Sequence, residues 1–179
     1  MRDAAAQGLA TGLVLTFESG EGEFHANGLL LVGTTCFRYE PRGWNRKTYD
    51  WKRMDKSLER WSKACLGATA FFGPNHFQDP QAEQTLEVVE AAQDPQRLPQ
   101  YGPCAAWCLL FFLLGAQEAK TSRGKADPLH AAKKAAALIT RSDTDKTTVI
   151  TGFAHVLMHA IRDWRREQGM PEALDDEDP

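Results

Sequence analysis

Apolar residues are most concentrated in residues 102–117, which read GPCAAWCLLFFLLGAQ. The thirteen residues from Cys104 to Ala116 carry no charge, and Pro103 suits the first position of a helix because its missing N–H group is not needed there. A helix that is apolar on every side is buried on every side. Thirteen residues at about 1.5 Å each reach about 20 Å, short of the roughly 30 Å hydrocarbon core of a bilayer. The pattern therefore predicts a central buried helix and not a membrane span.

The first part of the chain has the pattern of extended strands. Apolar positions alternate over residues 12–18, which is typical of a strand with one buried face. A second extended region runs from about residue 23 to 39, and it contains Asn27-Gly28, a common hairpin dipeptide. We therefore expect a small antiparallel meander. The alternative is that residues 4–17 and 29–39 are helical, because the run LLLVG has no clear period.

Helical periodicity dominates the rest of the chain. It predicts helices over the ranges 52–72, 80–92, 128–140 and 142–168. The apolar side of the first comprises Met54, Leu58, Trp61, Cys65 and Phe72. The buried side of the last is expected to comprise Val149, Ile150, Phe153, Val156, Leu157, Ala160, Ile161 and Trp164. The predicted fold class is α+β and mainly helical: a small N-terminal antiparallel β-meander followed by about five helices packed around the central buried helix at 102–117. An all-α fold is the alternative.

The composition is that of an ordinary globular domain. The chain has 179 residues, of which 42% are hydrophobic and 25% charged. We expect residues 1–170 to form one domain and the acidic residues 171–179 to be a disordered tail. The N-terminus lacks the layout of a secretory signal, so we expect a soluble, cytoplasmic protein whose four cysteines are reduced. The oligomeric state is not indicated.

The formal net charge of −3 conceals a strongly basic segment at residues 42–63, which holds eight Lys or Arg and three Asp or Glu. Cations neutralise phosphates, and aromatic rings stack on unpaired bases, so this segment suits nucleic acid. It also suits an acidic protein surface, since Arg and Trp are enriched in interface hot spots. A third interpretation is that its tryptophans are core and its charges solvate a helix. The predicted contact residues are Arg42, Trp44, Arg46, Lys47, Tyr49, Trp51, Arg53, Lys56, Arg60 and Lys63.

Two other patterns could hold a metal. Pro103-Cys104 with Cys108 resembles the P-C-x-x-C half of a zinc deaminase site, but it has one residue too many between the cysteines. The H-x-E half would be His25-Ala26-Asn27, which has asparagine in place of the acid. Both halves fail, so buried cysteines are the favoured interpretation.

His155 and His159 are four residues apart on the predicted last helix, a spacing that can present two imidazoles to a metal. They lie opposite the apolar side, next to arginines, which favours a solvated polar face. The favoured function is a non-catalytic binding protein that contacts nucleic acid or a nucleoprotein complex through residues 42–63. The alternatives are a protein-binding adaptor or inhibitor that uses the same surface, and a metal-dependent enzyme that uses the two histidines. No cofactor is expected, although an enzyme whose residues are scattered along the chain leaves no local trace.

Overall fold

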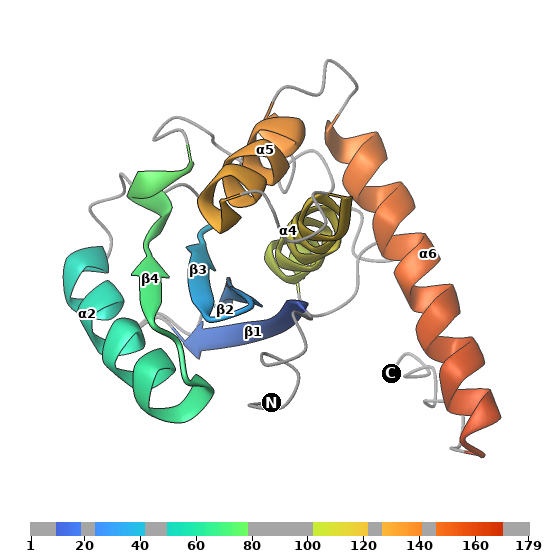
Figure 1. The fold of residues 1–179 in the computed structure, drawn as a ribbon. Helices are drawn as coiled ribbons and strands as arrows, with labels where there is room; N and C mark the ends of the chain where they lie inside the picture. The colour runs from blue at the N-terminus through green and yellow to red at the C-terminus, as the bar shows by residue number, and fades with distance from the viewer. Residues whose placement is uncertain are drawn as a thin grey trace.

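The structure, a computed structural model, describes residues 10–18, 24–41, 50–78, 102–121, 127–140 and 146–169. Its centre is a four-stranded sheet with the order β1-β2-β3-β4 (Figure 1). The strands are β1 (Ala10–Glu18), β2 (Phe24–Val32), β3 (Thr35–Tyr39) and β4 (Ala70–Phe72). The first three form an antiparallel meander, whereas β4 pairs with β3 in parallel. The predicted α+β class is therefore confirmed, and the all-α alternative is wrong.

Four α-helices lie within the described residues: α2 (Trp51–Trp61), α4 (Gly102–Thr121), α5 (Pro128–Thr140) and α6 (Lys146–Glu167). The sheet lies between α2 on one face and α4 on the other, and α5 and α6 pack outside α4 (Figure 1). The predicted helix at 80–92 and the predicted tail at 171–179 fall outside the described residues. With four helices beside a four-stranded sheet, the described chain is less dominated by helix than we predicted.

The face of the sheet that carries α4 is an aromatic core. Phe111 of α4 stacks on Tyr39 of β3 with ring centroids 4.4 Å apart. Gly28 of β2 lets α4 come close, because a methyl group there would lie 2.8 Å from the ring of Phe112. The central helix is thus buried against the sheet as predicted, but not on every side: Leu113 has 56% of its surface exposed.

The opposite face of the sheet is covered by α2 and by η1 (Ser62–Leu66), the π-helical turn that follows it. A second apolar cluster is buried there, made of Leu29, Leu31, Cys36, Leu66 and Ala68. No residue of α2 itself is fully buried, and Leu58 only packs at the edge of this cluster. Helix α2 is therefore a peripheral element with a small apolar contact.

We predicted a reversal at Asn27-Gly28, but both residues lie inside β2. The turn is at Gly33 and Thr34, where Gly33 has a φ of +57°. Glycine adopts this left-handed conformation without steric cost. Asn27 is instead fully buried, and its side-chain oxygen accepts a hydrogen bond from Arg38.

The helix predicted over residues 52–72 ends early. It stops at Gly67, whose φ is +74°, and strand β4 follows. Because the π-helical turn η1 has more residues per turn than an α-helix, the residues that face the sheet differ from those that α-helical periodicity predicts. Leu66 is buried there, while Trp61 and Cys65 are exposed, contrary to the prediction.

Helix α6 contacts α4 through Phe153, which packs against the aromatic core. The rest of its predicted inner side is not uniformly buried. Val156 is 68% exposed, Trp164 is 53% exposed and Ala160 is also exposed, so the prediction is wrong for these three residues. Among the described residues, no helix combines the length and apolar character needed to cross a membrane.

Candidate active site

Three polar side chains meet where the start of β2, the end of β3 and the first turn of α4 come together. His25 is the second residue of β2, Glu40 directly follows β3, and Cys104 is the third residue of α4. The sulfur of Cys108, one turn further along α4, lies 3.9 Å from the backbone oxygen of Ala26. The first turns of α4 are therefore held over the same end of β2.

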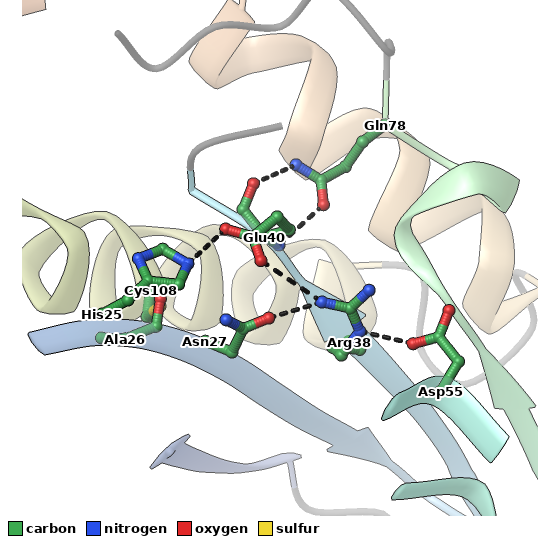
Figure 2. Close-up of polar contacts among 8 residues, drawn as sticks. All are labelled: His25, Ala26, Asn27, Arg38, Glu40, Asp55, Gln78 and Cys108. Carbon is green, nitrogen blue, oxygen red and sulfur yellow. Dashed lines mark hydrogen bonds and ion pairs between the residues drawn. The ribbon is translucent and has the colours of Figure 1, made fainter. Parts of the chain in front are cut away.

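His25 and Glu40 form a buried pair. The strand register, which pairs Gly28 with Tyr39, places Glu40 beside the first residues of β2. Nε2 of His25 lies 2.6 Å from Oε1 of Glu40 (Figure 2). Glu40 is fully buried and His25 is 9% exposed, so the contact is shielded from water. This hydrogen bond fixes the imidazole ring.

Cys104 is the second side chain that acts on His25. Burial alone would lower the pKa of His25, but hydrogen bonds with Cys104 and Glu40, and the negative charges of both, outweigh burial and raise the pKa to about 9. His25 is then protonated at neutral pH. A protonated imidazole beside a thiol stabilises the thiolate, which is the reactive form of cysteine. The arrangement favours a thiolate and imidazolium pair.

The position of Cys104 on α4 adds to this effect. Helix α4 is 20 residues long and has no acidic residue in its first turn. The unpaired N–H groups at the start of a long helix carry partial positive charge, which stabilises a thiolate nearby. Pro103 favours a helix start at this point. The local sequence therefore places the thiol at the positive end of the helix.

The other cysteines have different surroundings. Burial raises the pKa of Cys36 to about 12. Burial, together with the charges of Cys104 and Glu40, raises the pKa of Cys108 well above the usual range. Cys65 is exposed on η1. Of the four cysteines, all within the described residues, Cys104 is the one that is hydrogen-bonded to a histidine.

Glu40 is held by its neighbours. Its backbone N–H donates to Oε1 of Gln78 at 2.9 Å, and Nε2 of Gln78 donates to its backbone oxygen at 3.1 Å. Nη1 of Arg38 lies 3.4 Å from Oε2 of Glu40. One carboxylate oxygen therefore faces His25 while the other faces Arg38 (Figure 2).

The predicted binding surface lies elsewhere. Five of its residues fall outside the described part of the chain: Arg42, Trp44, Arg46, Lys47 and Tyr49. Arg53, Lys56 and Arg60 are exposed on α2, and Lys63 is exposed on η1. Trp51 is partly buried, with the Lys52 ammonium 5.4 Å from its ring, and Lys63 pairs with Glu59 at 2.6 Å. Because α2 and α4 cover opposite faces of the sheet, this surface is separate from Cys104 (Figure 1).

His155 and His159 are both exposed on α6. Within the described ranges, no three or more His, Cys, Asp or Glu side chains are grouped so that they could hold a metal ion. The sequence pattern had drawn attention to His25 and Cys104, but as halves of a failed zinc motif. The structure brings these two residues together and adds Glu40, which no local pattern singled out.

No family model matches the chain, and neither a curated protein nor a solved structure matches it. The geometry of the site therefore carries the assignment. A thiol that can act as a nucleophile interacts with an imidazole that can act as a base, and the imidazole is hydrogen-bonded to a carboxylate. These are the three roles of a covalent catalytic site.

Proposed function

We propose that the protein is a cysteine-dependent acyl-transfer enzyme, in its simplest form a hydrolase. Cys104 is the nucleophile, His25 is the acid and base, and Glu40 orients His25. The observation that carries this proposal is the position of His25 between the Cys104 thiol and the Glu40 carboxylate. The same three roles recur in thiol and serine hydrolases on unrelated folds. The substrate class is a carbonyl compound with a leaving group: an ester, a thioester or an amide.

The reaction begins from the thiolate and imidazolium pair. The sulfur of Cys104 attacks the carbonyl carbon and forms a carbon–sulfur bond. The bond to the leaving group then breaks, and the leaving group takes its proton from His25. This yields a thioester on Cys104 and a neutral imidazole. His25 next removes a proton from water, which attacks the thioester, releases the acid and restores the original pair.

The start of α4 supplies the electrostatic help that this step needs. Negative charge develops on the carbonyl oxygen during the attack on Cys104, and N–H groups aimed at that oxygen lower the barrier. The backbone N–H groups of the first turn of α4 have no partner inside the helix. They lie on the same turn as the nucleophile, as an oxyanion site requires.

Acetylation by p-nitrophenyl acetate tests the proposal. We expect one acetyl group per protein, located on Cys104 by mass spectrometry of the digested protein, with release of p-nitrophenol. Cys104→Ala should lose this reaction. Cys65→Ala, which removes the exposed thiol of η1, is the matched control and should keep it. Acetylation of Cys104→Ala at the wild-type rate would show that the proposal is wrong.

The cationic side of α2 supports a second function, contact with nucleic acid. Arg53, Lys56 and Arg60 are exposed on one helix, where they can neutralise phosphates. Changing all three to glutamate should abolish binding in a gel-shift assay without lowering the melting temperature, because none of them is buried. Unchanged binding rules this surface out. A partner retained after nuclease treatment points instead to an acidic protein surface.

A further inference from the structure

Arg38 of β3 lies between two carboxylates, that of Glu40 and that of Asp55 on α2. Its Nη1 is 3.4 Å from Oε2 of Glu40, and its Nε donates to Oδ1 of Asp55 at 2.5 Å. Nη1 also donates to the side-chain oxygen of Asn27 at 2.5 Å. These contacts join His25 and Glu40 to Asp55 of α2 in a row of alternating charges (Figure 2).

This row is costly to bury. The side chains of Arg38 and Glu40 are fully buried, and that of Asp55 is 15% exposed. Buried ion pairs often stabilise a protein no better than apolar residues of the same size would. Nη2 of Arg38, moreover, has no hydrogen-bond partner within the described part of the chain. Stability alone therefore gives a poor reason for these charges.

We propose that Arg38 and Asp55 are positioning residues for the active site, an inference that rests on the proposed function. Asp55 fixes the guanidinium of Arg38, and Arg38 holds Glu40 so that Oε1 of its carboxylate faces His25. The planar guanidinium suits this task because its N–H groups point in fixed directions. Helix α2 thus takes part in the site although it lies on the other face of the sheet.

Gly73 makes room for this contact. A methyl group at Gly73 would overlap Oδ2 of Asp55, so any side chain there displaces the carboxylate from Arg38. The φ of Gly73 is −72° and its ψ is 167°, which alanine adopts without strain. Gly73→Ala therefore moves Asp55 while every charge in the row is kept.

Loss of the Asp55 contact should be felt at Cys104. Among the described residues, the charged or titratable groups around His25 come from three places. Arg38 lies on β3 and Glu40 directly follows it, while Cys104 and Cys108 come from α4. Asp55 and, through it, His76 lie at the far end of the row. An Arg38 freed from Asp55 moves toward Glu40 and competes with His25 for it. The imidazolium is then less stabilised, and the Cys104 thiolate forms at higher pH.

The rate of Cys104 alkylation by iodoacetamide, followed by mass spectrometry from pH 4 to 10, measures this effect without a substrate. We expect Asp55→Asn and Gly73→Ala to raise the midpoint of the pH profile by roughly 0.5 to 1 unit. Glu59→Gln removes one negative charge from the same helix without a contact to Arg38. Gly152→Ala adds a methyl group in open space, with no neighbouring atom of the fold within 4 Å. Both controls should keep the wild-type midpoint.

A rise in Asp55→Asn and Gly73→Ala, with unchanged controls, supports the inference. Wild-type midpoints in both folded variants overturn it, and a fast reaction of wild-type Cys104 would then leave the proposed function standing. If Asp55→Asn does not fold by circular dichroism, Gly73→Ala decides alone. If wild-type Cys104 itself titrates like an ordinary thiol, near about pH 8.5, the proposed function and this inference both fail.

Discussion

Cys104 and Cys108 occupy successive turns of the same helix, yet their surroundings differ in kind. Cys104 faces the imidazole of His25 at the positive end of α4. Cys108 is fully buried against β2, where burial raises its pKa. Both are small, weakly polar side chains that suit an apolar helix, and the sequence pattern treats them alike.

The difference shows what makes a cysteine reactive in this fold. The helix supplies both thiols, but the sheet decides which of them meets a charged partner. His25 comes from the first residues of β2, beside the first turn of α4, whereas the second turn meets the backbone of Ala26. The proposed reactivity of Cys104 therefore depends on one end of the sheet and not on the sequence around the cysteine.

The rates at which the two thiols react test this comparison most strongly. In the folded protein at pH 6, iodoacetamide should alkylate Cys104 about 10³-fold faster than Cys108, because both are buried but only Cys104 interacts with a protonated imidazole, whereas burial raises the pKa of Cys108. Unfolding in urea should make the two rates equal within about threefold. Peptide mass spectrometry after short exposures gives both rates. Comparable rates in the folded state would remove the distinction between the two turns.

The pH dependence of stability tests the surroundings of Cys104, in the first turn of α4. The pKa of His25 rises from 6.5 to about 9 on folding, so the folded protein holds this proton more tightly. The stabilisation is complete below about pH 6.5 and is lost as the pH rises through about 9. With Cys104 as a thiolate, folding keeps one proton on His25 and removes one from Cys104, whose ordinary pKa is about 8.5, so the two effects offset each other between about pH 6.5 and 8.5. The unfolding free energy of the wild type, measured by urea denaturation, should therefore stay nearly constant over this range. A fall of about 1 kcal/mol or more per pH unit there would show that Cys104 keeps its proton.

The smallest effect is expected for Cys108, in the second turn of α4. Cys108→Ala should lower the free energy of unfolding by about 1 kcal/mol, because a buried side chain becomes smaller. The alkylation rate of Cys104 should stay within about twofold of the wild type. Thermal unfolding together with the same alkylation assay measures both. A large loss of Cys104 reactivity would mean that the two turns act as one unit.

Much of the fold is predictable because its elements have strong local patterns. The alternation in β1 and the uncharged run of α4 identify these elements without their neighbours. Strand β4 has only three residues, and it exists because it pairs with β3, which no local pattern reveals. The end of α2 was mispredicted for a similar reason, since a π-helical turn changes the period that the pattern assumes.

The active site was missed through one error of register. A turn at Asn27-Gly28 would keep Glu40 away from His25, whereas the actual turn at Gly33 brings them together. Polar residues within apolar strands, Asn27 and Arg38 among them, were the available sign that this face holds something other than core. Their partners lie on other elements, and the choice of partner follows from the pairing of strands.

The parallel pairing of β4 with β3 has a consequence for how this molecule opens. Parallel neighbours need a crossover connection, and here α2 is part of that crossover. Helix α2 is thus connected along the chain to both β3 and β4, and its Asp55 contacts Arg38 of β3. Amide protons of α2 and β4 should then exchange with deuterium together, as a single cooperative unit that is distinct from α6.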